Sequence, residues 1–376
     1  MTSEMKNILI IHETMNVGGA ERVLANILRH FDYERYNVDL LLQYKTGVFL
    51  SEIPPQVNVM GLYEAPMKPS LIGKMVRRVA FDYYFRDEKR RMRKVVGGKS
   101  YDAVISFMEG YAARMHSFVT DLTPRNISWV HTDLSLNNWY GHLFPQAKAQ
   151  AFYRNMSEIV FVSEGALKAF GKVYDSDASK RVVYNLTDPD EIRAKARQLD
   201  APSRRFTVCT VGRLSPVKRQ DRVVEMARIF KDRGIEADFW IVGDGTEMQN
   251  LRAQIDRLDV PDMVTLKGFQ KNPAAFIDSA DVFVLTSDAE GLAMVVIEAM
   301  SLGKPIVATR ITGIDELLAE GAGVLCECSA ESLAEPVIRL KNDPEKMAEY
   351  GSRALERSRA FSPAETMKAI YGLIDG

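Results

Sequence analysis

Two carboxylates and two cations stand out in the second half of the chain as residues that could carry chemistry. Glu290 and Glu298 are eight positions apart in the segment SDAEGLAMVVIEAMSLGKPIVAT, which covers 287–309. Arg213 and Lys218 lie in the segment VGRLSPVKRQD, directly after a run typical of a strand. Carboxylates beside backbone amides can bind hydroxyl groups, which both donate and accept. Two cations at the mouth of an α/β sheet can balance a diphosphate.

The segment with the two glutamates is predicted to bring both carboxylates to the start of one helix. We expect Glu290 to end a strand and the helix to begin at Gly291 and Leu292. Eight residues are a little over two turns, so Glu290 and Glu298 should lie on roughly the same side. The amides of Gly291, Leu292 and Ala293 would then be free donors at the helix N-terminus.

A glycine pair follows the first predicted strand, in the segment MNVGGAER. Gly18 and Gly19 let the backbone approach a phosphate, and the helix that follows presents its amides and the positive end of its dipole. The segment is neither G-x-G-x-x-G nor a P-loop, so those two fingerprints are absent. It indicates an anion site, and a plain tight turn is the alternative.

Glycines also end two predicted strands of the second half. IVGDG covers Ile241–Gly245, and LKGF covers Leu266–Phe269. Glycines at successive strand ends leave room for a planar base or a sugar against the backbone. Each motif is weak alone, and their repeated placement at strand ends is what favours a ligand site.

A sheet must position these residues, and the sequence predicts two. Short β-branched runs alternate with helical patterns, which is typical of βαβ units and parallel sheets. In the first half the predicted strands are 6–12, 38–44, 57–62, 102–107, 126–131, 158–163 and 181–184. In the second half they are 206–211, 237–242, 264–268, 281–286, 305–308 and 323–326. A polar stretch with two prolines, 185–205, separates the two series.

We therefore predict an α/β chain of two doubly wound, Rossmann-like domains that face each other across a cleft. The length of 376 residues suits two domains, with ligand at the carboxyl ends of the strands. The predicted bounds are 1–187 for an N-terminal domain, 188–204 for a linker and 205–358 for a C-terminal domain. The remaining segment, 359–376, is predicted as a helix that returns to the N-terminal domain.

The composition is that of a globular protein, and the charge is distributed unevenly. Residues 1–187 hold 24 Lys and Arg against 19 Asp and Glu, and the remainder holds 25 against 31. No run approaches the roughly 20 apolar residues of a membrane span, and the N-terminus has no signal-peptide pattern. We expect a cytoplasmic protein with no nucleic-acid partner. The odd number of cysteines, three, favours reduced thiols over disulfides or a metal site.

Taken together, the motifs resemble glycosyltransferase family 4, a large family of retaining enzymes with the GT-B fold. The resemblance rests on GGAERV, GRL with the lysine that follows, GDG, GF and Glu-x7-Glu within EGLAMVVIEAMSLGKPIVAT. It extends over nearly the whole chain, in the family's order. The motifs of the second half are much more specific than those of the first.

The resemblance implies a nucleotide-sugar donor and assigns residues to its diphosphate. Arg213 and Lys218 should neutralise the diphosphate and stabilise it as a leaving group, with Gly18 and Gly19 capping it from the other domain. His131, in ISWVHTD, stands where many members of the family carry a histidine near the donor sugar. A strand-end histidine that only caps a loop is the alternative for His131.

The other donor contacts follow from the same resemblance. Glu290 corresponds to the glutamate that contacts hydroxyls of the transferred sugar, and Glu298 to the one that holds the ribose. Gly268 and Phe269 lie where the base meets the backbone. UDP is expected as the nucleotide on family frequency alone, and no metal or other cofactor is expected.

The implied activity is transfer of a hexose or N-acetylhexosamine to a hydroxyl, with front-face attack and no protein nucleophile. Glu109, in SFMEG, is a candidate on the acceptor side. The expected acceptor is a glycan or a polyprenyl-diphosphate-linked glycan of polysaccharide or cell-envelope synthesis. A nucleotide-sugar epimerase of GT-B fold, a glycan phosphorylase and a non-catalytic carbohydrate-binding protein remain as alternatives.

A basic stretch in the first half suggests where the acceptor is met. The segment 74–94 holds nine cations interleaved with apolar residues. As a helix it would present an apolar strip flanked by Lys and Arg, which suits the anionic inner face of a plasma membrane. An ordinary amphipathic helix packed on the first domain is the alternative.

Overall fold

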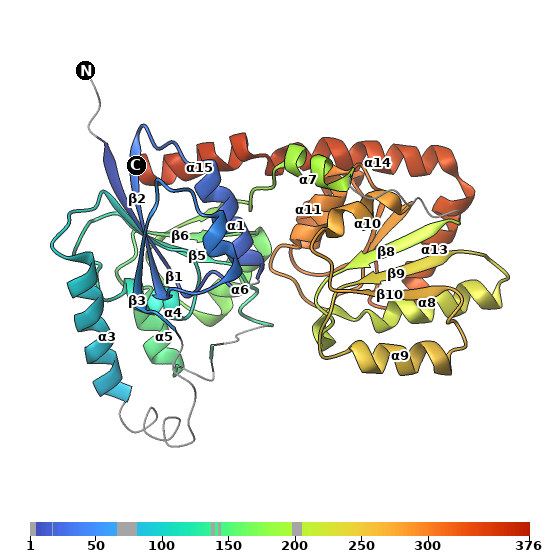
Figure 1. The fold of residues 1–376 in the computed structure, drawn as a ribbon, viewed down its shortest axis with the longest axis horizontal. Helices are drawn as coiled ribbons and strands as arrows, with labels where there is room; N and C mark the ends of the chain where they lie inside the picture. Colours follow the sequence, from blue (N-terminus) through green and yellow to red (C-terminus); the bar gives the residue numbers. More distant parts are fainter. Residues whose placement is uncertain (1–4, 17, 66–80, 137–139, 142–143, 198–204) are drawn as a thin grey trace. The chain divides into compact units, whose positions relative to one another are not determined.

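The chain folds into two compact units, each built on its own parallel sheet (Figure 1). The computed structural model describes 5–16, 18–65, 81–136, 140–141, 144–197 and 205–376, with side chains left out at 81–85. Unit 1 comprises Met1–Leu186 and Pro363–Gly376. Unit 2 comprises Thr187–Ser362.

Unit 1 contains a seven-stranded sheet with the strand order β3-β2-β1-β4-β5-β6-β7. Its strands are β1 Lys6–His12, β2 Tyr36–Tyr44, β3 Asn58–Tyr63, β4 Ala103–Ser106, β5 Asn126–Val130, β6 Glu158–Phe161 and β7 Ser179–Val182. Its helices are α1 Gly19–Arg29, α3 Phe81–Val96, α4 Tyr111–His116, α5 Gln146–Phe152, α6 Glu164–Val173 and α15 Pro363–Asp375, with the 3-10 helix η1 Val48–Glu52. Because β1 and β4 are neighbours, the strand order reverses between them, and ligands bind at such switch points in open α/β sheets.

Unit 2 repeats the plan with six strands in the order β10-β9-β8-β11-β12-β13. Its strands are β8 Thr207–Val211, β9 Asp238–Val242, β10 Val264–Gly268, β11 Val282–Leu285, β12 Ile306–Thr309 and β13 Val324–Cys326. Its α-helices are α7 Pro189–Ala196, α8 Asp221–Asp232, α9 Met248–Arg257, α10 Pro273–Ser279, α11 Met294–Ser301, α12 Ile314–Leu317, α13 Ala330–Asn342 and α14 Pro344–Ser358. Its 3-10 helices are η2 Pro216–Lys218, η3 Ala319–Gly321 and η4 Arg359–Phe361.

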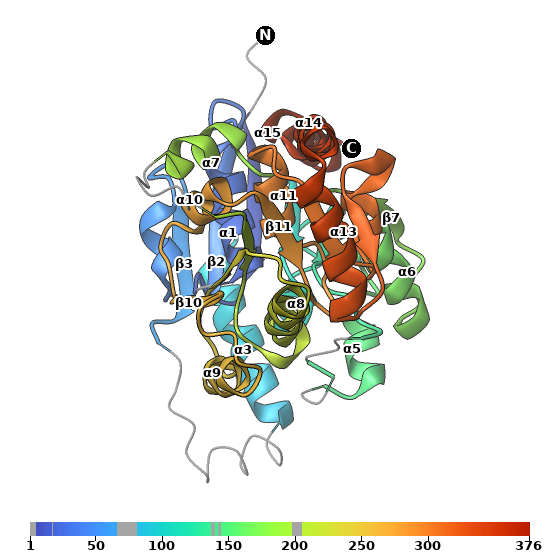
Figure 2. The same ribbon diagram turned by 90° about the vertical axis from the view of Figure 1, so that its right-hand side faces the viewer.

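The sheet of unit 2 is covered on both faces. Helix α8 packs with α9 and α13, whereas α10 and α11 pack with α7, and α14 packs on α11 (Figure 2). Strands covered on both faces read as continuous apolar runs, and β9 and β11 are of this kind. The switch point of this sheet lies between β8 and β11, which pair directly.

The predicted fold class is confirmed. The structure has two doubly wound parallel sheets, and each of the thirteen predicted strands is present with its ends shifted by at most two residues. The alternation of β-branched runs and helical patterns was sufficient for this because all strands in both sheets are parallel, and the central strands, such as β4, β5, β6, β11 and β12, are fully buried.

Helix α7 and helix α15 attach to different units. Ile192 and Ala196 of α7 are buried against Ala274, so the predicted linker begins with a helix that belongs to unit 2, and 198–204 lies outside the described residues. In α15 the ring of Tyr371 stacks on Tyr36 of β2 at 5.2 Å between centroids. This packing makes the C-terminal helix part of unit 1.

Candidate functional site

An ion pair joins two loops at the switch point of unit 2. Lys218, the last residue of η2, follows β8, and its Nζ lies 2.5 Å from Oε1 of Glu290, which follows β11. The Ser287 hydroxyl donates to the same carboxylate oxygen at 2.7 Å. The side chain of Glu290 is 10% exposed and that of Lys218 is 27% exposed. The pair is therefore partly desolvated, which strengthens its electrostatic attraction.

The local structure around Glu290 differs from the prediction. Strand β11 ends at Leu285 and helix α11 begins only at Met294, so Glu290 lies in a loop and does not end a strand. The prediction was wrong because this loop is held by tertiary hydrogen bonds that sequence periodicity does not reveal, among them Asp288 N to the Val217 carbonyl at 2.8 Å.

The helix start also lies later than predicted. Ala293 is the N-cap of α11, with extended backbone, and its carbonyl accepts the Val296 amide at 2.9 Å. Gly291 and Leu292 therefore precede the helix and do not begin it. Glu298 alone lies within α11, so the two glutamates do not share one helical face. Both remain on the segment that follows β11.

The GDG motif positions the loop that bears Lys218. A Cβ on Gly243 would clash with the Gly212 carbonyl, and one on Gly245 would clash with the Leu214 carbonyl. Both glycines have positive φ, 142° and 159°. Leu214 N in turn donates to the Asp244 carbonyl at 2.9 Å. These glycines thus allow two backbone segments to touch, whereas the sequence interpretation gave them the role of making room for a base or sugar.

The remaining residues predicted in unit 2 lie around the same sheet edge. Arg213 is exposed, and its carbonyl accepts from Gln220 Nε2 at 3.1 Å. Gly268 ends β10 with φ 67°, and Phe269 beyond it is 63% exposed. An exposed aromatic ring at a strand end is an available stacking surface.

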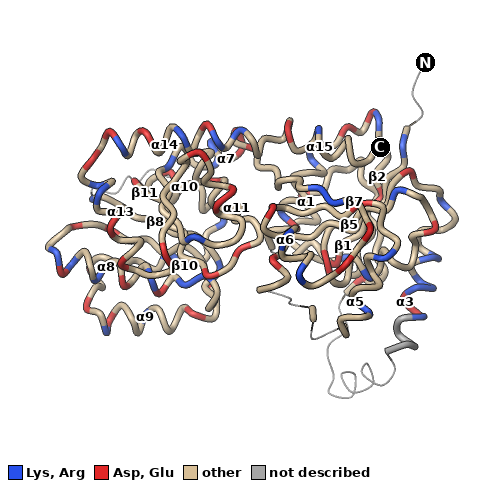
Figure 3. Tube along the Cα trace, turned by 180° about the vertical axis from the view of Figure 1, so that it is seen from behind, with Lys and Arg blue, Asp and Glu red and all other residues tan. Residues whose placement is uncertain are grey.

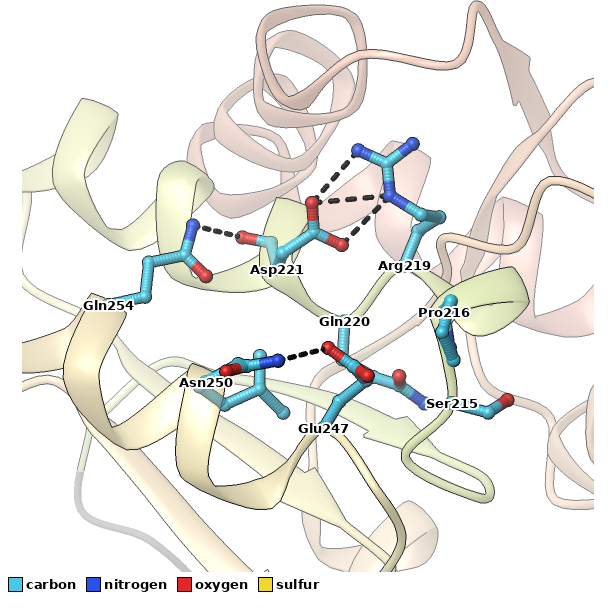
Figure 4. A pocket seen from close by; sticks show the side chains of 9 residues that line it. Ser215, Pro216, Arg219, Gln220, Asp221, Glu247, Asn250 and Gln254 are labelled. Carbon is cyan, nitrogen blue, oxygen red and sulfur yellow. Dashed lines mark hydrogen bonds and ion pairs between the residues drawn. The ribbon is translucent and has the colours of Figure 1, made fainter.

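A pocket of about 250 Å³ lies beside the Lys218 loop (Figure 4). It is lined by Ser215, Pro216, Arg219, Gln220, Asp221, Glu247, Asn250, Leu251 and Gln254. Arg219 and Asp221 face each other there, with Arg219 Nη2 donating at 2.8 Å. Lys218 and Glu290 are not among the lining residues, so we do not assign the donor to this pocket.

In unit 1 the predicted residues Glu109 and His131 contact each other. The Glu109 carboxylate accepts the His131 amide and the Thr132 hydroxyl, each at 2.8 Å, and it is 1% exposed. Burial lowers the pKa of His131 to about 3, helped by nearby His12 and partly offset by a backbone hydrogen bond with Phe107. His131 Nε2 has no hydrogen-bond partner within the described part of the chain. His131 is therefore a neutral, buried imidazole.

His12 is a residue that the sequence analysis missed. It ends β1 at the same sheet edge, its ring centroid is 6.2 Å from that of Phe107, and the Phe107 ring is 4.8 Å from His131. Burial lowers the pKa of His12 to about 4. Its position at the end of the first strand was the available signal, because parallel strands end at one edge of a sheet.

The start of α1 is covered by a carboxylate of the same helix. Gly18 is the N-cap, and Gly19 is the first residue of α1. A Cβ on Gly18 would meet the carboxylate of Glu21, whose Oε1 lies 4.0 Å from His12 Nε2. A carboxylate near a helix N-terminus is favoured by the dipole. The contact of Gly18 and Gly19 with a diphosphate stays a prediction.

Helix α3 uses its described apolar residues for packing. Met92 and Val96 are buried in the core of unit 1, and Glu88 pairs there with the buried Arg114. Arg86, Lys89 and other cations are exposed along α3 (Figure 3). This supports the packed-helix alternative for the described half. The apolar residues between 74 and 85 on which the membrane prediction rests lie outside the described side chains.

Two properties of the described residues concern membrane insertion and metal binding. No described helix is long and apolar enough to cross a bilayer. No group of three or more His, Cys, Asp or Glu side chains with metal-binding geometry occurs in the part that the structure describes. All three cysteines are free thiols, and burial raises the pKa of Cys209 to about 12 and that of Cys326 to about 11.

The fold and the unit 2 site together define a two-unit α/β protein with a charged pair at a switch point. Residues 191–357, which lie in unit 2, match the family model described as glycosyl transferases group 1. The chain has the fold of Anabaena Alr3699/HepE, solved in complex with UDP and glucose, with a TM-score of 0.76 and 22% identity. That likeness covers 99% of this chain and 100% of the other.

Curated relatives carry glycosyltransferase names. The chain is 28% identical over 247 residues to N-acetyl-alpha-D-glucosaminyl L-malate synthase of Bacillus anthracis, covering 63% of this chain and 62% of that protein. It is 24% identical over 371 residues to an N-acetylgalactosaminyltransferase of Campylobacter jejuni, covering 95% and 96%. The chain matches between 57% and 62% of the length of the first three curated relatives.

Proposed function

We propose that this chain is a retaining, metal-independent glycosyltransferase that moves a hexose or N-acetylhexosamine from a UDP-sugar to a hydroxyl of a glycan or lipid-linked glycan. The observation that carries the proposal is the Lys218–Glu290 pair at the switch point of unit 2. It joins a cation for phosphate to a carboxylate for hydroxyls within the matched glycosyltransferase segment.

The cations of the loop after β8 act on the leaving group. When the bond between sugar and phosphate breaks, negative charge builds on the diphosphate. Fixed positive charges beside it stabilise that charge and so lower the free energy of the transition state. Lys218 is held in place by Glu290, so little rearrangement is needed to present its ammonium group. Arg213 is exposed on the same loop and supplies the second cation.

The carboxylate of Glu290 binds the transferred sugar. Lys218 and Ser287 both donate to Oε1, and Oε2 accepts a sugar hydroxyl in this proposal. Glu298 holds the ribose diol, and the amides of 291–293 add donors. Gly268 and Phe269 meet the base, supported by the exposure of the Phe269 ring.

Residues of unit 1 serve the reacting sugar and the acceptor. His131 is neutral, because its pKa is lowered to about 3, and a neutral imidazole can exchange hydrogen bonds with hydroxyls at neutral pH. Glu109 acts on the acceptor side by orienting His131 and Thr132, whose amide and hydroxyl it binds. The acceptor hydroxyl attacks from the face that the leaving group vacates, which gives retention without a protein nucleophile.

Two comparisons support the choice of donor and acceptor. The Anabaena protein of the same fold was solved with UDP and glucose, which supports a UDP-sugar. The Campylobacter relative is named for transfer to a diphospho-undecaprenol-linked sugar, which supports a lipid-linked acceptor. An acceptor of this kind would place the enzyme at the inner face of the plasma membrane, with the exposed cations of α3 toward anionic lipid.

A thermal-shift screen of UDP-, GDP- and ADP-sugars, followed by a transfer assay, tests the proposal. A donor at a hundred times its dissociation constant should add about 2.7 kcal/mol to the free energy of unfolding. The stabilising donor, incubated with lipid-linked glycan acceptors and chelator, should yield a product with the donor's anomeric configuration by NMR. Epimerised donor without an acceptor, or an inverted product, would refute the proposed reaction.

A further inference from the structure

A second charged cluster joins the same two loops that carry Lys218 and Glu290. Arg222, in the first turn of α8, donates from Nη1 to the Thr286 carbonyl at 2.7 Å. Its Nη2 lies 2.7 Å from Oδ1 of Asp288. Thr286 and Asp288 belong to the loop after β11, four and two residues before Glu290. The arginine thus reaches from the element after β8 to the loop that carries the glutamate.

The backbones of the two loops are joined at the same place. The Asp288 amide donates to the Val217 carbonyl at 2.8 Å, and the Thr286 hydroxyl donates to the Lys218 carbonyl at 2.8 Å. Val217 and Lys218 are therefore fixed through their main chain by residues on either side of Ser287. A shift of Asp288 would move the backbone that carries the lysine.

Burial and charge make this link costly to break. The Arg222 side chain is 6% exposed, whereas the Asp288 side chain is 42% exposed. A buried guanidinium needs its carboxylate, because an unpaired buried charge destabilises its surroundings. Asp288 also accepts from Arg219 at 3.1 Å through Oδ2, so one carboxylate serves two arginines.

Arg219 itself shows that the loop is held in an unusual conformation. It directly follows Lys218 and has φ 51°, in the left-handed region that non-glycine residues seldom adopt. Its guanidinium is held from both sides, by Asp288 and by Asp221, and Figure 4 shows the contact with Asp221. Such backbone strain persists where surrounding contacts over-determine it.

We infer that Asp288 and Arg222 are positioning residues that hold the Lys218 and Glu290 side chains within ion-pair distance. Nucleotide binding would then depend on the Asp288–Arg222 pair, although neither residue contacts the nucleotide. The inference rests on the proposed function, because it takes Lys218 as the group that binds the diphosphate. Asp288 and Arg222 touch neither donor nor acceptor in this account. They act through the loop that they fix.

A double-mutant cycle measured by calorimetry tests the inference. The probe is the tightest-binding of UDP, GDP and ADP, and the proteins are the wild type, Asp288→Ala, Lys218→Ala and the double variant. Asp288→Ala should weaken binding about tenfold in the wild type, and by less than twofold once Lys218 is absent, since residues that act as one unit are not additive. Asp232→Ala, which removes the exposed partner of Arg228 on the same helix, is the matched control and should stay within twofold.

Each outcome separates the two ideas. Equal losses from Asp288→Ala in both backgrounds, or no loss in either, would overturn the positioning role while the donor site stands. A wild type that binds none of the three nucleotides would overturn the proposed function and this inference with it. Asp288→Asn, which keeps the shape and loses the charge, supplies the same comparison should Asp288→Ala fail to fold.

Discussion

The two units share one architecture but treat the polar groups at their strand ends in opposite ways. Unit 2 presents formed charges, with Lys218 paired to Glu290 and Arg222 paired to Asp288. Unit 1 buries neutral imidazoles, and the nitrogens of His12 and Nε2 of His131 have no hydrogen-bond partner in the described residues.

This difference indicates a division of work. Fixed charges suit a ligand whose own charge is large, such as a diphosphate. Because their loops are already held in place, little reorganisation is needed when the ligand binds. Neutral imidazoles suit hydroxyls, because an imidazole carries one donor and one acceptor nitrogen and a hydroxyl can both donate and accept. A doubly wound sheet therefore does not determine the ligand, and the loops that follow its strands do.

The largest expected effect is an acid lability confined to unit 1. All five histidines of the sequence lie there, and burial lowers the pKa values of His12 and His116 to about 4 and that of His131 to about 3. The unfolded chain takes up protons near pH 6.5 and the folded one does not. Stability is therefore retained above about 6.5 and lost as pH falls toward 4, at up to about 1.4 kcal/mol per pH unit for each histidine.

Thermal unfolding of the whole chain between pH 7 and 4.5, with limited proteolysis to locate the first cleavages, measures this. His116→Gln should flatten the slope by about a third, because His116 is fully buried between Ser106 and Asn126. His30→Gln, on a partly exposed residue, is the control. Early cleavage in unit 2 at low pH would contradict the contrast between the units.

The next largest effect concerns the two cations of the unit 2 site. Lys218→Ala and Arg213→Ala should each lower turnover by roughly two to three orders of magnitude, because each removes a positive charge that stabilises the negative charge on the leaving diphosphate. Steady-state kinetics with the donor found by the screen measures it. Lys231→Ala removes a partly exposed cation of α8 that pairs with Asp259, and it should leave turnover within twofold. Near-normal rates in both site variants would contradict the mechanism.

The sequence predicts the strands of the two sheets well and the contacts between their loops poorly. Strand positions were predictable because apolar periodicity is local. The sequence also indicated that Lys218 and Glu290 lie on segments that follow strand-like runs, whereas their roles stay predictions. The conformation of the loop 286–293 and the Asp288–Arg222 pair depend on contacts between distant segments. Nothing in a linear pattern reports such partners.

A smaller loss is expected when Glu290 loses its charge. Glu290→Gln keeps the shape but removes the ion pair with Lys218, and it should lower kcat/KM by about one to two orders of magnitude, the range for hydrogen bonds to charged groups. The matched control is Glu335→Gln, whose exposed carboxylate pairs with Arg233. A rate equal to wild type in Glu290→Gln would remove the sugar-binding role.

The smallest effect concerns the exposed cations of α3. Flotation with anionic vesicles should show binding that weakens as the salt concentration rises. Reversing Lys89 and Arg90 to Glu should make the free energy of vesicle binding less favourable by about 1 kcal/mol or more per side chain. The same reversal at Arg252 and Arg257, exposed on α9 of unit 2, should change nothing. Vesicle binding that does not change with salt concentration, or an equal loss of binding in both double variants, would show that α3 is an ordinary packed helix.

Hydrogen–deuterium exchange of the whole chain, with and without a saturating nucleotide, tests the central claim most directly. If the charged loops of unit 2 hold the donor diphosphate, the strongest protection should fall on peptides spanning 212–222 and 286–298, and it should fade in Lys218→Ala at the same concentration. Protection that leaves both peptides unchanged, while the nucleotide demonstrably binds, would contradict the account.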